Sequence, residues 1–265
     1  MRTKHDTDED SRPTIVGHRG CAAENPENTV AAVGAAAGTV DAIEIDVRRC
    51  GTGELVAIHD STLDRLTGEQ GRVDETSLET LADLDVLESG EPIPPLVAIF
   101  EAAPSTLTIV FDLKEPGLVE DLLSLLPGFD HDVLFSSIHP GIIAEVRDRD
   151  PSIPTAVVVR EPVHLRAVRP LALALPNWAY GPVNVAGMIE RARTLGCDAI
   201  HPRYELCLRT DLVTLAHSAG VRVAPWTVTT NREYASLRET GVDAVITDVC
   251  AGLLESPRQV DDPTE

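Results

Sequence analysis

The chain has 265 residues, 43% of them hydrophobic, and a formal net charge of -21, so it is long enough to bury a full core as one large domain. The acid excess excludes a nucleic-acid partner and disfavours an anionic membrane surface, because both are bound by clustered lysine and arginine. The N-terminus lacks the apolar core of a signal peptide, and no apolar run approaches the roughly 18 residues of a transmembrane helix, which predicts a cytoplasmic protein with no membrane insertion.

Arginine supplies nearly all of the positive charge, since only Lys4 and Lys114 are lysines. An acid excess with few lysines is typical of proteins from cells that hold molar salt, where the Debye length falls to about 3 Å and charge repulsion is screened. We therefore expect a halophilic protein whose acidity reflects its solvent and not its substrate.

The five cysteines are Cys21, Cys50, Cys197, Cys207 and Cys250. Their number is odd, and no two of them form a Cys-x-x-Cys pair. In a chain expected in the reducing cytoplasm, such cysteines predict neither a disulfide framework nor a zinc site.

Short apolar runs alternate with helical patterns along the chain. The runs predict strands at Thr14–His18, Ala42–Val47, Leu107–Leu113, Val133–Ser137, Thr155–Val159, Asp198–Pro202, Val221–Thr227 and Asp243–Thr247. The stretches between them predict helices that include Glu27–Ala37, Leu118–Leu126, Gly141–Asp148, Asn184–Leu195, Asp211–Ala219 and Asn231–Glu239. This alternation predicts a parallel sheet covered by helices, and the number of units fits a closed (β/α)8 TIM barrel, with a doubly wound open sheet as the alternative.

The connection between Val47 and Leu107 is too long for a single loop. It includes a further apolar run, Leu55 to His59, before a barrel helix resumes at Leu96–Ala103. We interpret about residues 50–95 as a hairpin-like extension with a small insertion after strand 2, on the catalytic face of the barrel. The polar and charged ends, 1–12 and 256–265, are predicted to be disordered, which leaves a single domain over 13–255.

Polar side chains gather where the predicted strands end, which is where a barrel carries its active site. They are His18, Arg19, Glu44, Asp46, Asp112, Lys114 and Trp226. Glu44 and Asp46 alternate on one strand and therefore share a face, on which carboxylate oxygens suit a hard divalent cation. Because the chain otherwise avoids lysine, Lys114 indicates a role for a compact ammonium, such as contact with a phosphate oxygen.

Two histidines, His18 and His59, bracket the Glu44-x-Asp46 pair in the sequence. In-line displacement at phosphorus needs one group to accept a proton and another to donate one. A single histidine at a strand end is more often structural, and a Glu-x-Asp pair is as often a solvated face. Their conjunction predicts a metal-dependent phosphodiesterase.

A series of longer motifs makes this prediction specific. They are Gly17-His18-Arg19-Gly20, Pro26-Glu27-Asn28-Thr29, Glu44-x-Asp46, His59-Asp60, Leu63-Asp64-Arg65-x-Thr67-Gly68, Asp112-x-Lys114, Ser136-Ser137, Trp226-Thr227-Val228 and Gly241-Val242-Asp243-Ala244-Val245-Ile246-Thr247-Asp248. In this order, over about residues 14 to 255, the chain resembles the glycerophosphodiester phosphodiesterase family of the PLC-like phosphodiesterase barrels.

The resemblance implies a (β/α)8 barrel that hydrolyses glycerophosphodiesters to glycerol phosphate and an alcohol. It implies a divalent metal, Mg²⁺ or Ca²⁺ with Mn²⁺ as a further candidate. On this chain it implies that the metal is bound by Glu44, Asp46 and Asp112, and that the acid and base are His18 and His59. It also implies that phosphate is bound by Arg19 and Lys114, and that Trp226 forms an apolar wall for the glycerol. Asp112 stands where the family usually has Glu, and its shorter side chain leaves room for a bridging water.

Several points stay open on the sequence alone. Glu27 either orients the His18-Arg19 turn or, with Asn28, merely begins a helix. We take His18 as the base and His59 as the acid as a working assignment. The leaving alcohol, the glycerol stereochemistry and the oligomeric state, a homo-oligomer included, are not determined by these patterns.

Two other functions fit parts of the pattern. A phospholipase C- or D-like enzyme acting on lipids can share the barrel and the paired histidines, but it needs an apolar lip or a basic face, and neither is found. A catalytically silent phosphate-binding module would not need both histidines and the Glu44-x-Asp46 pair intact. The favoured partner is therefore a small-molecule glycerophosphodiester.

Overall fold

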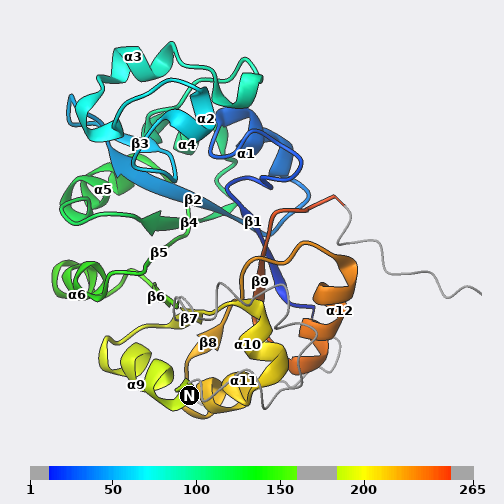
Figure 1. The fold of residues 1–265 in the computed structure, drawn as a ribbon. Helices are drawn as coiled ribbons and strands as arrows, with labels where there is room; N and C mark the ends of the chain where they lie inside the picture. The colour runs from blue at the N-terminus through cyan, green and yellow to red at the C-terminus, as the bar shows by residue number, and fades with distance from the viewer. Residues whose placement is uncertain (1–11, 160–183, 252–265) are drawn as a thin grey trace, which may run out of the picture.

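A computed structural model of the chain describes residues 12–159 and 184–251. Eight parallel strands follow one another around the sheet in the order β8-β7-β6-β5-β4-β2-β1-β9 (Figure 1). Their bounds are β1 Thr14–His18, β2 Ala42–Arg49, β4 Thr108–Leu113, β5 Val133–Ser137, β6 Thr155–Val158, β7 Ala199–His201, β8 Arg222–Val223 and β9 Ala244–Thr247. All eight predicted strands are present, although β8 is much shorter than expected.

The sheet is nearly closed between β8 and β9, where individual backbone hydrogen bonds replace a regular ladder. The amide of Asp243 donates to the carbonyl of Val223 (3.0 Å), and the amide of Ile246 donates to that of Pro225 (2.9 Å). Pro225 has no N–H to donate, which limits regular pairing of β8 beyond Val223. The (β/α)8 TIM barrel is confirmed, and the doubly wound alternative is excluded.

Helices cover the outside of the barrel (Figure 1). They are α1 Val30–Ala36, α4 Leu96–Ala102, α5 Val119–Leu125, α6 Pro140–Arg149, α9 Val185–Thr194, α10 Tyr204–Arg209, α11 Leu212–Ser218 and α12 Asn231–Thr240. The sequence predicted all of these except α10, which is too short to show a helical period. Among the residues described, no helix is long and apolar enough to cross a membrane.

The predicted insertion after strand 2 is confirmed. Its strand β3 (Leu55–Ala57) pairs antiparallel with the end of β2, and the short helices α2 (Asp64–Thr67) and α3 (Leu78–Ala82) follow. The insertion has an apolar cluster of its own, made of Cys50, Val56, Ile58, Leu63, Leu66, Val73, Leu81, Val86 and Ile93. In Figure 1 it lies beside the carboxyl end of β2. It is therefore a small packed unit next to the strand ends.

Alternation along β2 places the acidic pair inside the barrel. Ile43, Ile45 and Val47 are fully buried in the cluster that packs beneath helices such as α4. Successive side chains of a strand point to opposite faces, so Glu44 and Asp46 face the barrel interior instead.

The predicted disordered ends lie outside the described residues, except for Arg12. The Arg12 guanidinium forms an ion pair with Asp41, with 2.6 Å between Nη1 and Oδ2. Its carboxylate partner also accepts a hydrogen bond from the amide of Ile15 (2.8 Å). Arg12 is thus connected through Asp41 to the start of β1.

The expectation of no disulfide is wrong. Cys21 and Cys250 form one, with Cα atoms 5.8 Å apart and a sequence separation of 229 residues. Pairing of β1 with β9 brings the loops after these strands together, and residue spacing carries no sign of this. Disulfides persist in oxidising surroundings, so this bond does not support the predicted cytoplasmic location. The remaining three cysteines are free and buried.

We expect reduction of the Cys21–Cys250 disulfide to lower the free energy of unfolding by about 3 kcal/mol, because the bond restricts the unfolded chain. Urea denaturation with and without a dithiol reductant measures the difference. A Cys21→Ser variant should be insensitive to the reductant. Equal unfolding midpoints of the wild type in both conditions would contradict the prediction.

Candidate active site

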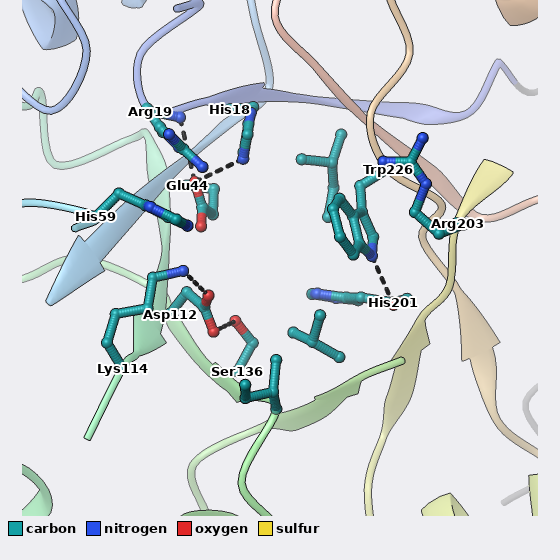
Figure 2. Close-up of a pocket in the computed structure, with 13 residues that line it drawn as sticks. His18, Arg19, Glu44, His59, Asp112, Lys114, Ser136, His201, Arg203 and Trp226 are labelled. Carbon is teal, nitrogen blue, oxygen red and sulfur yellow. Dashed lines mark hydrogen bonds and ion pairs between the residues drawn. The ribbon is translucent and has the colours of Figure 1, made fainter. Parts of the chain in front are cut away.

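The carboxyl ends of the strands surround one cavity of about 400 Å³ (Figure 2). Seven of the eight predicted site residues line it: His18, Arg19, Glu44, His59, Asp112, Lys114 and Trp226. The eighth, Asp46, is fully buried directly behind them. The structure therefore brings all the predicted site residues together.

Three buried carboxylates form an acidic cluster at the base of this site. Glu44, Asp46 and Asp112 each offer an oxygen that lies within 4.8 Å of the others. Asp46 and Asp112 are direct neighbours across the β2–β4 ladder. Burial, together with the charge of Asp46, raises the pKa of Glu44 to about 8. Clustered carboxylate oxygens of this kind are suited to a divalent cation.

Lys114 balances part of this charge. Its Nζ lies 2.5 Å from Oδ1 of Asp46 and also contacts Oδ2 of Asp112. Burial would lower the pKa of Lys114, but these two carboxylates raise it above its ordinary value. Burial would raise the pKa of Asp46, but Lys114 and Arg19 hold it well below its usual range.

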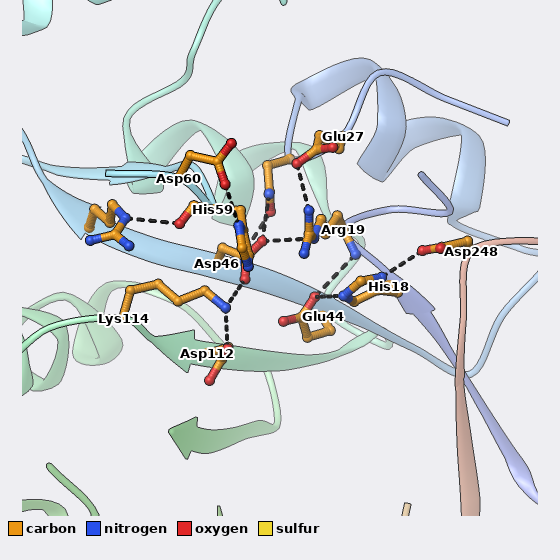
Figure 3. Close-up of polar contacts among 12 residues, drawn as sticks. His18, Arg19, Glu27, Glu44, Asp46, His59, Asp60, Asp112, Lys114 and Asp248 are labelled. Carbon is orange, nitrogen blue, oxygen red and sulfur yellow. Dashed lines mark hydrogen bonds and ion pairs between the residues drawn. The ribbon is translucent and has the colours of Figure 1, made fainter. Parts of the chain in front are cut away.

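His18 ends β1 with its two ring nitrogens in different surroundings (Figure 3). Its Nδ1 lies 2.5 Å from Oδ1 of Asp248, and its Nε2 lies 4.0 Å from Oε2 of Glu44. Burial lowers the pKa of His18, but Glu44 and Asp248 outweigh it and the pKa is raised. Asp248 follows β9, so pairing of the first and last strands brings this carboxylate to the imidazole.

His59 reaches the site from the insertion. Its Nδ1 lies 2.6 Å from Oδ1 of Asp60, and its backbone carbonyl accepts a hydrogen bond from Nε of Arg48 (2.9 Å). Burial lowers the pKa of His59 by more than the charge of Asp46 raises it. The two histidines thus have pKa values shifted in opposite directions.

Arg19 lies against the carboxylates of the site. Its backbone N–H donates to Oε2 of Glu44 (3.2 Å), its Nη1 donates to Glu27 (2.9 Å), and its Nε lies 3.1 Å from Oδ2 of Asp46. Its backbone is left-handed, with φ 54°, an uncommon conformation for arginine. The turn thereby aims both the amide and the guanidinium at acidic side chains.

The open question on Glu27 and Asn28 is answered by the helix start. Thr29, and not either of these residues, caps α1, since its Oγ1 accepts a hydrogen bond from the amide of Ala32 (3.1 Å). Asn28 donates from Nδ2 to Asp46 (2.9 Å) and accepts from the Asp46 amide (3.0 Å). Glu27 therefore contacts Arg19, and Asn28 holds Asp46 of the acidic pair.

The opposite wall of the cavity carries Trp226 (Figure 2). Its indole N–H donates to the carbonyl of His201 (2.9 Å), and the Arg203 guanidinium lies 4.9 Å from its ring centroid. Burial lowers the pKa of His201 to about 4, so this imidazole is neutral near pH 7. Across the cavity, Ser136 donates to Asp112 (3.3 Å).

The sequence interpretation gave no role to Asp60, His201, Arg203 or Asp248. The available signal for His201, Arg203 and Asp248 was their position, because they stand at or just beyond the ends of predicted strands. Asp60 stands next to His59 in the quoted motif. The other three have partners on different strands and loops, Trp226 for His201 and Arg203 and His18 for Asp248, and only the folded barrel identifies them.

Two histidines and a buried acidic cluster at the strand ends of a (β/α)8 barrel define a class of phosphodiester-cleaving enzymes. The model of the glycerophosphoryl diester phosphodiesterase family matches residues 18–115 and 114–251. The chain belongs to this family and is a phosphoric diester hydrolase.

Relatives extend over most of the chain. A glycerophosphodiester phosphodiesterase of Caldanaerobacter subterraneus subsp. tengcongensis is 29% identical over 249 residues, covering 88% of this chain and 93% of that protein. One of Bacillus altitudinis is 27% identical over 251 residues, covering 88% and 94%.

Solved structures have the same fold. A phosphodiesterase of Oleispira antarctica, in complex with the product sn-glycerol-3-phosphate, has a TM-score of 0.74 at 25% identity and covers 91% of this chain and 95% of that one. A glycerophosphodiester phosphodiesterase of Thermotoga maritima has a TM-score of 0.71 at 22% identity, covering 90% and 95%.

Replacement of Lys114 by Met should destabilise the metal-free protein by about 3 kcal/mol, because Asp46 and Asp112 lose their buried cationic partner. A divalent cation should then raise the thermal unfolding temperature more in the variant than in the wild type, because its charge replaces the ammonium. Thermal unfolding in EDTA and in excess Mg²⁺ or Ca²⁺ measures both effects. Lys114→Arg, which keeps the charge, is the control; an equal cation-induced shift in Lys114→Met and wild type would contradict the prediction.

Proposed function

We propose that this protein is a metal-dependent glycerophosphodiester phosphodiesterase that releases glycerol phosphate and an alcohol. The observation that carries the proposal is the pair of histidines facing one cavity, each with its Nδ1 held by a carboxylate, beside three buried acidic residues. The names of its relatives, and the glycerol phosphate bound to the Oleispira enzyme, support the substrate class.

Glu44, Asp46 and Asp112 would hold the divalent ion, Mg²⁺ or Ca²⁺ with Mn²⁺ as a third candidate. When bound, such an ion neutralises a phosphodiester and stabilises the charge that develops during displacement. The buried carboxylates fit this role because burial, and then the charge of Asp46, raise the pKa of Glu44, and a bound cation would favour its ionised form. Asn28 fixes one carboxylate of the set through its two hydrogen bonds with Asp46.

The histidines would divide the proton transfers. The lowered pKa of His59 favours a neutral imidazole that accepts a proton from the nucleophile, which is water or the glycerol hydroxyl of the substrate. The raised pKa of His18 favours an imidazolium that protonates the leaving alkoxide. This proposal reverses the working assignment, in which His18 was the base.

The remaining predicted residues would bind the substrate. Arg19 and Lys114 would attract the phosphate and stabilise its charge in the transition state. Trp226 would pack against the glycerol carbons, because its indole N–H is already engaged by His201 and its ring forms the cavity wall. A cavity of about 400 Å³ suits a small diester.

Other expectations from the sequence stay predictions. These are adaptation to high salt and a cytoplasmic location, while the oligomeric state stays open. The single-domain boundaries 13–255 are also a prediction, since residues 252–255 lie outside the described part.

The enzyme should release glycerol phosphate from glycerophosphocholine in the presence of a divalent cation, and EDTA should abolish the release. His18→Ala and His59→Ala should each lower kcat by at least about 10²-fold, because general acid–base catalysis contributes that much or more. Coupled detection of glycerol phosphate measures the rate, and His139→Ala, an exposed histidine outside the cavity, is the control. Wild-type rates in both cavity variants would refute the proposal.

The pH dependence of kcat/KM should be bell-shaped, with its maximum near neutrality. Activity should rise as His59 loses its proton at a pKa below the ordinary 6.5, and fall as His18 loses its proton at a pKa above 6.5. The residual activity of His59→Ala should lack the acidic limb, and that of His18→Ala should lack the alkaline limb. The opposite loss of limbs would restore the assignment of His18 as the base.

A further inference from the structure

Arg65, on the short helix α2 of the insertion, binds two carboxylates at once. Its Nη1 and Nη2 donate to the two oxygens of Glu27, each at 2.8 Å, and its Nε donates to Oδ2 of Asp60 at 2.5 Å. Glu27 is buried, with 7% exposure, although Arg65 itself is exposed. The guanidinium therefore covers a buried acid from the solvent side.

Each of these carboxylates also holds a residue of the site. Oε1 of Glu27 accepts a hydrogen bond from Nη1 of Arg19 (2.9 Å). Oδ1 of Asp60 lies 2.6 Å from Nδ1 of His59. One unbroken chain of charged contacts thus runs from Arg19 in the barrel, through Arg65, to His59 in the insertion.

Only an arginine provides this connection. The fork of its guanidinium matches both oxygens of Glu27, while its third N–H remains directed at Asp60. A lysine ammonium is a point charge and cannot repeat the bidentate contact. Exposed ion pairs contribute little individually, but a bidentate pair to a buried carboxylate within a network is the exception.

The insertion holds Arg65 in place. Its neighbours Leu63 and Leu66 are each 3% exposed and belong to the apolar cluster of the insertion. α2 is thereby fixed by its apolar side, and Arg65 is left to face the barrel.

Resting on the proposed function, in which Arg19 binds phosphate and His59 transfers a proton, we infer that Arg65 is a positioning residue for both. Through Glu27 it sets the direction of the Arg19 guanidinium. Through Asp60 it sets the orientation of the His59 ring. A displacement of about 1 Å in such groups is enough to slow a reaction by up to 10²-fold.

The inference predicts a split between kinetic parameters with glycerophosphocholine as the substrate. Arg65→Gln should lower kcat and raise KM, each by about tenfold, because Glu27 and Asp60 then both lose their contact with the guanidinium. Asp60→Asn should mainly lower kcat, and Glu27→Gln should mainly raise KM. In the Asp60→Asn background, Arg65→Gln should change only KM, since the connection from Arg65 through Asp60 to His59 is already lost.

Arg72 provides a matched control in the same insertion. It pairs with Asp74 at 2.7 Å and with Glu75 at 3.7 Å, and its side chain is 50% exposed, against 46% for Arg65. Neither Asp74 nor Glu75 lines the cavity. Arg72→Gln should leave kcat and KM unchanged. Arg65→Lys should recover at most one of the two parameters, because it can hold only one carboxylate.

Circular dichroism and thermal unfolding establish that each variant is folded, and Arg65→Lys replaces Arg65→Gln if the latter is not. Wild-type kinetics in a folded Arg65 variant, or the same change in kcat with and without Asp60→Asn, would overturn the inference. Near wild-type rates in His59→Ala would instead overturn the proposed function, so the two failures are distinguishable.

Discussion

The burial of three carboxylates within 4.8 Å of one another is the constraint on which the rest of the site depends. The β2–β4 register imposes it by placing Asp46 directly beside Asp112, while alternation along β2 adds Glu44 on the same face. Repulsion between buried like charges is costly, so the surrounding residues compensate it. The Lys114 ammonium lies between two of these acids, and Arg19 contacts the other side of the cluster.

A second set of carboxylates contacts the two histidines and Arg19 and lies apart from the acidic cluster. Asp248 and Asp60 each hold the Nδ1 of one histidine, which leaves Nε2 of His18 on the side of the acidic cluster. Glu27 holds Arg19 in the same way. Carboxylates therefore lie in two layers around the cavity, and the two histidines and Arg19 lie between these layers. This order keeps each basic side chain fixed before a substrate enters, which is what electrostatic preorganisation requires.

The sequence predicts the parts of this arrangement that follow local rules. Period-two alternation places Glu44 and Asp46 on one face, and the common edge of parallel strands collects the other candidates. Prediction from the sequence fails where contacts depend on closure of the barrel. Asp248 reaches His18, and Cys21 reaches Cys250, only because the last strand pairs with the first, across more than 200 residues. The role of Glu27 is hidden for a different reason, since an acidic residue just before a helix has an equally ordinary explanation as part of its first turn.

The insertion explains how His59 can lie outside the barrel strands and still be held in a defined position. His59 and Arg65 stand on a segment that has its own apolar cluster and that is joined to β2 by the antiparallel strand β3. Pairing of β3 with β2, together with the hydrogen bond from Nε of Arg48 to the carbonyl of His59, attaches the segment to this strand. The contact of Arg65 with Glu27, a residue that precedes α1, supplies a second point of attachment on the barrel side. Attachments to β2 and to the segment before α1 together restrict the orientation of the insertion, and with it the position of His59.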